Sequence, residues 1–499
     1  MSVERVRQSR RNPDTRHTGP AATFKYFAEA GFSWLGAETM YSSMEPIMSF
    51  LRGLAKAENM KTYGVHHALQ WSTQPMDQIE HVRRYRLALY TSYMLGATDI
   101  NTEEGLWRME EYYVWFNRFS DTCKMHLKEQ QDFYRYVQSH SRTGVFRTPY
   151  AILHGRDDGC TFFGKNKTWG FHIPQTAAED SWDLLTAFYP KSVPVQHIYA
   201  HNCPTDRPVG FYTGTPYGQP DFIPVETGER VWNDYRFMAF LGYNRCTEED
   251  AEKLLAYVKN GGKLLLTRAH LAKTTNMDAI YRGDLEFDPC ALSFAEGDAK
   301  LCADTVNGKP VTVCQNATVP DEVLSRTDSG APLLCRYCVG EGEVLLYNVG
   351  EYPAAEAIKA YYEQTLKSLI REATDAEDVW AETGEDVEFA VYEQENGDSH
   401  VCFLAVDWYR DPAMLRHATL CVGEEEYDVC MPFGVMLKCV VGESVAAWAV
   451  SESGEVLEVG NTSVTVQGSG VVDFCIAKGG EQKKITVDFS AASVQTISV

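Results

Sequence analysis

The hydrophobic positions along the chain change their period twice and so divide it into three regions. In the first, from about residue 20 to 144, short apolar runs alternate with longer segments whose apolar residues recur at helical spacing. The apolar runs lie at 32–40, 63–71 and 97–105, and the helical segments lie at 42–59, 79–96 and 107–139. Strands that alternate with helices of this length predict βα units and a parallel sheet.

The second region, residues 145–375, also has a β/α pattern, but its strands are short and almost continuously apolar. Such runs are typical of parallel strands whose two sheet faces are both covered by helices. They lie at 148–155, 194–201, 235–242, 262–270 and 342–350. A helix is predicted after Thr247, which caps it, with Asp250 at its third position and Gly261 near its end. We therefore predict a doubly wound α/β domain.

The third region, residues 380–499, shows no helical period. Short Val-rich runs recur about every 8–12 residues between turn residues, which is typical of an antiparallel β-sandwich. The predicted fold class is thus α/β plus all-β, with residues 1–19 as a flexible N-terminal tail.

Composition limits the partners. The net charge is −23, and no Lys/Arg block is long enough to form the basic face that nucleic-acid binding requires. No apolar run reaches the roughly 18–20 residues of a membrane span, and the first twenty residues lack the apolar stretch of a secretory signal. Cys335 and Cys338 form a CxxC without the second pair of a zinc site. We expect a cytoplasmic protein with no membrane, nucleic-acid, metal or cofactor partner.

Two segments carry a resemblance to a known family. Residues 241–267 combine a loop, an acidic helix start, a helix, a Gly-Gly pair and a strand, and residues 96–107 read GATDINTEEGLW. They resemble the trimerisation domain and the last barrel strand of family 42 glycoside hydrolases, which are β-galactosidases. The resemblance implies that 20–144 is the end of a TIM-type (β/α) barrel, 145–375 a glutamine amidotransferase-like, flavodoxin-like trimerisation domain, and 380–499 a small β-domain.

Amidotransferase chemistry is not expected from the second region. That reaction needs a nucleophilic cysteine on a Gly-flanked turn between a strand and a helix, with a histidine nearby. No Gly-x-Cys-x-Gly follows the strand at 262–270, and the nearest cysteine, Cys246, stands just before a helix cap. We therefore predict a structural version of that fold.

Glycoside hydrolysis typically uses two carboxylates, and in a barrel these lie at the carboxyl ends of strands. Three strand ends here carry suitable side chains. The predicted catalytic residues are Glu38, Glu103 and Glu104, and the predicted sugar contacts are Glu45, His67, Gln70, Trp71, Asn101 and Trp107. These residues have structural alternatives: Glu38 could be a helix-start acid and Trp71 a core residue. His66 and His67 point to opposite sides of their strand, so at most one of them faces the barrel interior.

A count of strands limits the catalytic prediction. A complete barrel needs about 250 residues, whereas fewer than 145 precede the second region, with three strand signals. The family's general acid, on strand four, matches no position here, and the place of its nucleophile, after strand seven, holds Gln70. Glu38 or Glu103 could take the nucleophile's role, a different carboxylate pair could act, or another polypeptide could complete the barrel.

Two functions follow from these observations. The first is a glycoside hydrolase-like protein that acts on O-glycosidic bonds, β-galactosidase-like in kind. The alternative is a non-catalytic carbohydrate-binding or oligomerisation subunit of a barrel glycosidase. A partial barrel would expose an unpaired strand edge and an uncovered apolar stripe, so we expect a homo-oligomer. The family resemblance implies a trimer.

Overall fold

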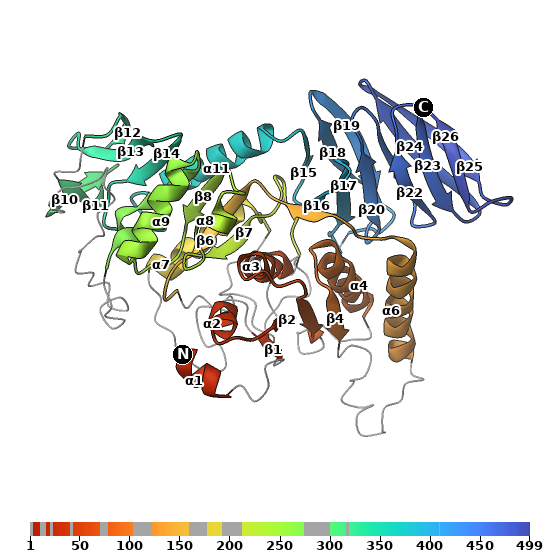
Figure 1. Cartoon of the computed structure of the whole chain (residues 1–499), viewed down its shortest axis with the longest axis horizontal. Coiled ribbons are helices and arrows are strands. Elements are labelled where there is room, and N and C mark those ends of the chain that lie inside the picture. The colour runs from red at the N-terminus through yellow and green to blue at the C-terminus, as the bar shows by residue number, and fades with distance from the viewer. Residues whose placement is uncertain are drawn as a thin grey trace.

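The computed structural model describes residues 3–9, 16–19, 23–39, 43–69, 78–102, 121–158, 177–191, 212–273, 300–315, 319–408 and 410–499. Within them the chain forms a βα region, an α/β region and a β-rich C-terminal region (Figure 1). The predicted class, mixed α/β followed by β-rich structure, is confirmed at this level.

The βα region contains a four-stranded parallel sheet in the order β1-β2-β3-β4. Its strands are β1 (Arg16–Gly19), β2 (Trp34–Thr39), β3 (Gly64–His67) and β4 (Asp99–Thr102). Its helices are α1 (Val3–Ser9), α2 (Phe24–Glu29), α3 (Met44–Ala57), α4 (Ile79–Met94) and α6 (Asp121–Ser139). Three of these strands are the predicted ones.

Helix α1 and strand β1 lie within residues 1–19, the segment predicted to be an N-terminal tail. The strand Arg16–Gly19 has no apolar residue, so the hydrophobic pattern contains no signal for it. It forms because its backbone pairs in parallel with β2, where Arg16 is opposite Trp34 and Gly19 is opposite Ala37.

The α/β region is built on a seven-stranded sheet in the order β12-β13-β14-β9-β8-β6-β7. Its strands are β6 (Tyr150–His154), β7 (Asp221–Pro224), β8 (Phe237–Phe240), β9 (Lys263–Thr267), β12 (Glu322–Arg326), β13 (Pro332–Val339) and β14 (Gly342–Tyr347). The strands from β14 to β7 are parallel, whereas β12 and β13 are antiparallel. A separate hairpin joins β10 (Lys300–Val306) to β11 (Lys309–Gln315).

Helices accompany this sheet. They are α7 (Ala177–Asp180), the 3₁₀ helix η4 (Ser181–Ala187), α8 (Glu229–Trp232), α9 (Glu248–Lys259), the 3₁₀ helix η5 (Arg268–Leu271) and α11 (Lys359–Asp375). Helix α9 confirms the predicted cap, because Thr247 and Asp250 form a reciprocal capping box. The predicted strand at 194–201 lies outside the described residues, and the strands between 300 and 339 were not predicted.

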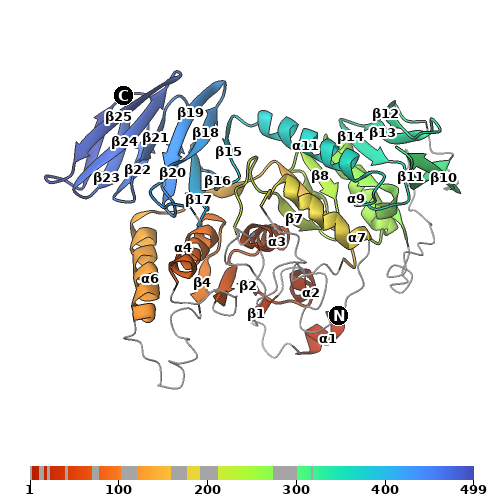
Figure 2. The ribbon, with the colours of Figure 1, turned by 180° about the vertical axis from the view of Figure 1, so that it is seen from behind.

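The C-terminal region holds three sheets. The largest is a seven-stranded antiparallel sheet in the order β25-β24-β21-β20-β17-β16-β5. It lies between two three-stranded sheets, β15-β18-β19 and β22-β23-β26 (Figure 2). Each smaller sheet shares a hydrophobic core with one face of the large sheet. The strands are β5 (Val145–Arg147), β15 (Val379–Thr383), β16 (Val387–Glu393), β17 (Ser399–Ala405), β18 (Arg416–Val422), β19 (Glu425–Met431), β20 (Met436–Val441), β21 (Ala446–Ala449), β22 (Gly454–Val459), β23 (Ser463–Gly468), β24 (Val471–Lys478), β25 (Glu481–Asp488) and β26 (Val494–Ser498).

Helices α3 and α4 lie between the sheet of the βα region and the two later regions (Figure 1). Helix α3 packs on β2 and also on β7, and α4 contacts α6 and β17. Every residue of α3 except Lys56 is buried, which is why this helix has no wide polar face. The first region is therefore docked on both of the others.

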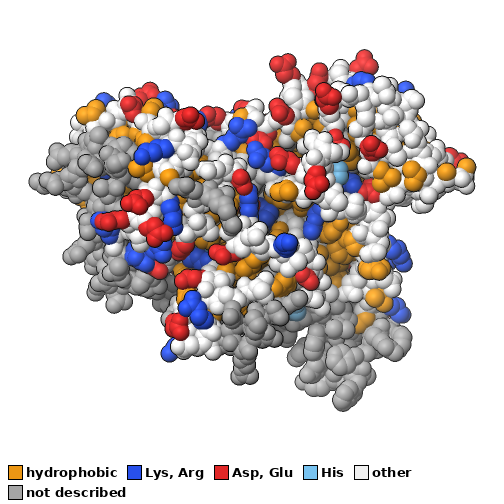
Figure 3. Space-filling view, in the orientation of Figure 1, with side chains coloured by type: hydrophobic (Ala, Val, Ile, Leu, Met, Phe, Trp, Pro, Cys, Tyr) orange, Lys and Arg blue, Asp and Glu red, His pale blue; other side chains and the backbone are white. Residues whose placement is uncertain are grey.

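On the face drawn in Figure 3, Asp and Glu side chains gather over the tips of the C-terminal sheets, and Lys and Arg are interspersed with acids elsewhere among the described residues. No helix in the described part of the chain is long and apolar enough to cross a membrane.

Candidate functional site

Three polar side chains form one row at the carboxyl ends of β2, β3 and β4. In the register of the sheet, Glu38 is opposite His66, and His66 is opposite Asn101. Residues in one row of a sheet point to the same face, and neighbouring strands lie about 4.8 Å apart, so the Cα atoms of Glu38 and Asn101 are about 10 Å apart. Glu38 and His66 are half-buried, and Asn101 is exposed.

The row faces away from helices α3 and α4. Consecutive residues of a strand alternate between faces, so Thr39 and His67 point to the other side. There His67 contacts Ser92 of α4, and Ala37 and Val65 belong to the buried hydrophobic core. The row of Glu38 therefore lies on the sheet face opposite to these buried groups.

A tryptophan lies on the same face as the row, one layer deeper. Trp34 Nε1 donates a hydrogen bond of 3.0 Å to Asp99 Oδ2. A Cβ atom placed on Gly64 would lie 2.6 Å from Cζ2 of Trp34, so only glycine leaves room for the indole ring there. Trp34 and Glu38 are separated by an even number of residues and therefore share a face. The acid thus stands above an aromatic layer fixed by Asp99.

His67, a predicted sugar contact, lies on the helix-facing side instead. Its Nδ1 is 2.7 Å from Thr39 Oγ1, and its Nε2 is 3.0 Å from Ser92 Oγ. The side chain is fully buried, and this burial lowers the pKa of His67 to about 3. A neutral imidazole enclosed by protein groups cannot reach a sugar without disrupting the packing of α4, so the geometry disfavours the predicted contact.

Glu45, another predicted sugar contact, is also fully buried. Its Oε1 accepts a hydrogen bond of 2.8 Å from the backbone N–H of Thr213, in the α/β region. Burial raises the pKa of Glu45 to about 8. The carboxyl group therefore faces the junction between regions rather than the open face, which also disfavours a sugar contact.

The remaining predicted site residues, Gln70, Trp71, Glu103, Glu104 and Trp107, lie outside the described residues. The structure adds His66 and Trp34 to the candidate site. The alternation of side chains along β2 and β3 could have identified them. Trp34 and Glu38 are four residues apart and so point to the same face. His66 points to that face as well, because its neighbour His67 points to the opposite one.

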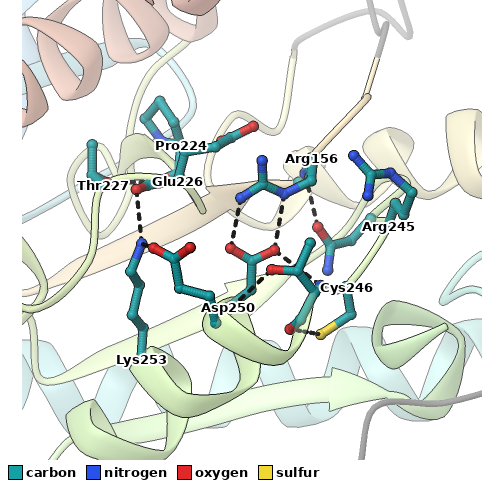
Figure 4. A network of polar contacts seen from close by, with 12 residues as sticks. Arg156, Pro224, Glu226, Thr227, Arg245, Cys246, Asp250 and Lys253 are labelled. Carbon is teal, nitrogen blue, oxygen red and sulfur yellow. Dashed lines mark hydrogen bonds and ion pairs between the residues drawn. The ribbon is translucent and has the colours of Figure 1, made fainter. Parts of the chain in front are cut away.

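The α/β region offers a second place for a ligand. Doubly wound sheets bind ligands at the carboxyl ends of their strands where the strand order reverses, here between β6 and β8. There the Arg156 guanidinium donates hydrogen bonds of 2.9 and 2.8 Å to the Asp250 carboxylate, and its backbone N–H donates to Asn244 (Figure 4). Lys25 of α2 donates to the Gly155 carbonyl at 2.6 Å. The described side chains at this crevice thus bind one another.

Cys246 stands near this crevice, just before α9 (Figure 4). It is buried, and its Sγ lies 3.4 Å from the Thr247 carbonyl oxygen. The ring of His270 contacts Thr267 and the Leu241 carbonyl. Among the described residues these contacts do not form the cysteine–histidine pair of an amidotransferase.

A metal site is not formed by the described residues, which contain no group of three or more His, Cys, Asp or Glu side chains able to hold an ion. Cys335 and Cys338 both lie on β13, three positions apart, so they point to opposite faces of the strand.

No protein-family model matches the sequence, and no curated protein matches it. Solved structures do show similarity. A β-galactosidase from Bacillus circulans sp. alkalophilus is 12% identical at a TM-score of 0.44, over 85% of this chain and 66% of that one. A catalytic mutant of a GH42 β-galactosidase from G. stearothermophilus is 10% identical in sequence at a TM-score of 0.43. The match covers 95% of this chain and 60% of that one. The α-L-fucosidase isoenzyme 2 from Paenibacillus thiaminolyticus is 11% identical at a TM-score of 0.44. The match covers 95% of this chain and 64% of that one.

The chain thus spans less than two thirds of the length of each of these three proteins. The family that the sequence resembles, family 42, is represented among the similar structures.

Proposed function

We propose that this chain is a glycoside hydrolase-like protein whose carbohydrate site lies on the face of the βα sheet that points away from α3 and α4. The observation that carries the proposal is the row of Glu38, His66 and Asn101 at the carboxyl ends of three parallel strands. Active sites of (β/α) barrels are built at this end of the strands. A carboxyl, an imidazole and an amide supply the acceptors and donors that sugar hydroxyls need.

Glu38 is the proposed catalytic carboxylate. Hydrolysis of a glycosidic bond typically needs a second carboxylate about 5–9.5 Å away, depending on the stereochemical outcome. Two strand spacings, about 10 Å between Cα atoms, separate Glu38 from β4, and side chains that lean together would shorten this distance. Glu103 and Glu104, which follow β4 in the sequence, are the proposed partners. His66 and Asn101 would position the sugar.

The substrate class comes from the family resemblance, which favours a β-galactoside. Trp34 lies buried beneath the row, and its hydrogen bond to Asp99 would hold the floor of the proposed site in place.

A second candidate function is carbohydrate binding without cleavage. It is favoured by one observation: within the described row Glu38 is the single carboxylate, and the nearby Asp99 is engaged by Trp34 and by Thr98 Oγ1 at 3.1 Å. A site with a single carboxylate in its row lacks one half of the usual catalytic pair.

The test is hydrolysis of a panel of nitrophenyl glycosides, including the β-galactoside, together with calorimetric titration of the free sugars. We expect Glu38→Gln to lower kcat about 10²–10⁴-fold with sugar binding retained. The matched control is Glu395→Gln, at an exposed glutamate of the C-terminal region. Binding without hydrolysis by the wild type would support the second function. Neither binding nor hydrolysis, or full activity of Glu38→Gln, would overturn the proposed site.

A further inference from the structure

Arg268 is a buried arginine at the carboxyl end of the parallel part of the α/β sheet. It directly follows β9, and Asn348 directly follows the neighbouring strand β14, where Tyr347 is opposite Thr267. Arg268 is 4% exposed and Asn348 is 1% exposed. The Nε of Arg268 donates a hydrogen bond of 2.6 Å to Asn348 Oδ1. In α/β folds, ligands bind beyond this end of the strands.

Asn348 is held in the orientation that presents its oxygen to the arginine. Its Nδ2 donates to the carbonyl of Cys314 on β11 at 2.9 Å and to the carbonyl of Pro332 on β13 at 3.3 Å. Its backbone pairs with the same two segments, because its carbonyl accepts from the Cys314 N–H and its N–H donates to the Leu333 carbonyl. The amide oxygen is thereby left for Arg268, and the guanidinium is fixed along one edge.

The terminal nitrogens of Arg268 have no comparable partners. A guanidinium has five N–H donors, and among the described residues Arg268 uses one of them, toward Asn348. Its Nη2 is buried without a hydrogen-bond partner in the described part of the chain. Buried Arg52, by contrast, binds the Asp221 carboxylate at 2.6 Å. Glu351, on the loop after β14, accepts a backbone N–H and forms no ion pair with Arg268.

The titratable groups around Arg268 do not neutralise its charge. The guanidinium favours ionisation of Cys314, Cys335 and Tyr337, but burial outweighs this effect. Burial raises the pKa of both thiols to about 11 and that of the phenol to about 12, so all three are neutral at pH 7. A buried charge without a counter-ion is costly. One bound monoanion would balance it, whereas a dianion would leave a net negative charge in the interior.

We propose that Arg268 and Asn348 form a binding site for a small monocarboxylate at the carboxyl ends of β9 and β14. The two terminal nitrogens of Arg268 donate parallel hydrogen bonds to the two carboxylate oxygens, which the planar guanidinium fork matches in geometry. Asn348 is a positioning residue that holds the opposite edge of the fork. The site belongs to the α/β region, whereas Glu38 belongs to the βα region, so it does not depend on the proposed sugar chemistry.

The experiment is calorimetric titration of sodium acetate into the full chain at pH 7, with ionic strength held constant by sodium chloride. We expect the wild type to bind acetate and Arg268→Met to bind it about 10–100-fold more weakly, because hydrogen bonds to a charged group are lost. The control is Arg326→Met, which removes an exposed arginine from β12 of the same sheet and should leave the affinity unchanged.

Three results would overturn the site. They are absence of acetate binding by the wild type, equal affinity in the wild type and Arg268→Met, and binding of uncharged acetamide as tightly as acetate. Inorganic phosphate is the second ligand tested. Tighter binding of phosphate than of acetate would overturn the assignment to a monocarboxylate.

Two further measurements keep the proposal testable if Arg268→Met fails to fold. Asn348→Asp places a carboxylate beside the Nε of Arg268, so the arginine gains an internal counter-ion and acetate affinity should fall. In the wild type, acetate should raise the midpoint of thermal unfolding more than sodium chloride of equal ionic strength, because a ligand of the folded state stabilises it. Undiminished acetate binding by Asn348→Asp, or equal responses to the two salts, would contradict the site.

Discussion

The imidazole of His67 has hydroxyl groups on both sides, Thr39 on the neighbouring strand and Ser92 on α4. Burial holds the ring in its neutral form, because a buried imidazolium would give up its hydration. The adjacent residue, His66, points to the opposite face of the sheet, away from α4. A shift of one position along a strand therefore separates a core histidine from a candidate site residue.

We predict that His67→Leu lowers the free energy of unfolding at pH 7 by about 1–3 kcal/mol, because Thr39 and Ser92 lose their buried partner. The pKa of His67 is about 3 in the folded protein, below its ordinary value of 6.5, so its contribution is present above pH 6.5 and is lost as pH falls toward 3. Urea unfolding between pH 4 and 7 should therefore show a smaller pH dependence for the variant.

The control for this prediction is His417→Leu, at an exposed histidine beside Asp428. Its stability should stay within about 0.5 kcal/mol of the wild type. A His67→Leu protein with unchanged stability and unchanged pH dependence would show that the two hydroxyl contacts do not matter for folding.

At the scale of elements, helix α3 is the piece that joins the βα region to the α/β region. Phe50 packs edge-to-face on Phe222 of β7 with ring centroids 4.2 Å apart, and Arg52 binds Asp221 of the same strand. Gly53 allows this approach, since a Cβ atom there would lie 2.2 Å from the Phe222 carbonyl oxygen. The obstacle is backbone, which cannot rotate away as a side chain can.

We predict that Gly53→Ala destabilises the protein by about 2–4 kcal/mol, even though alanine favours a helix by roughly 1 kcal/mol over glycine. The clash must push α3 away from β7 and so disturb the buried contact of Arg52 with Asp221. Thermal unfolding followed by circular dichroism measures the effect. Gly384→Ala is the matched control, because a Cβ atom at that position meets nothing within 4 Å. Equal melting temperatures for both variants would contradict the close approach.

At the scale of the whole molecule, Arg86 is one of the side chains that anchor the C-terminal region to α4. Arg86 Nε donates to the Gly434 carbonyl at 2.7 Å, and its terminal nitrogens bind Glu452 at 2.7 Å and Glu129 at 3.2 Å. The guanidinium also lies over the Tyr90 ring at 4.4 Å. One side chain thus links α4, α6 and the C-terminal sheets.

We predict that Arg86→Ala lowers the free energy of unfolding by about 2–4 kcal/mol. This is somewhat less than the loss of one partner of a fully buried ion pair, because the Arg86 side chain is partly exposed. Scanning calorimetry should show a lower onset of unfolding and a van't Hoff enthalpy below the calorimetric enthalpy, since the C-terminal region would unfold separately. Arg135→Ala, which removes a mostly exposed contact with Asp132 on α6, serves as the control. A single wild-type-like transition in Arg86→Ala would refute this anchoring role.

The amino-acid sequence by itself determined those features that depend on nearby residues. The cap of α9 could be predicted because Thr247 and Asp250 interact across a single helical turn. The change from a helical period to short Val-rich runs likewise marked the start of the β-rich region, because each strand shows its own alternation.

Tertiary structure alone decided which distant segments pair and which face each side chain takes. Strand β1 has no apolar residue, and β5 pairs with β16 across the whole α/β region, so neither carries a local signal. The row of Glu38, His66 and Asn101 depends on the register of three strands, and the contact of Glu45 with Thr213 depends on how α3 docks. Such pairings are set by the free energy of the assembled chain, which no window of neighbouring residues contains.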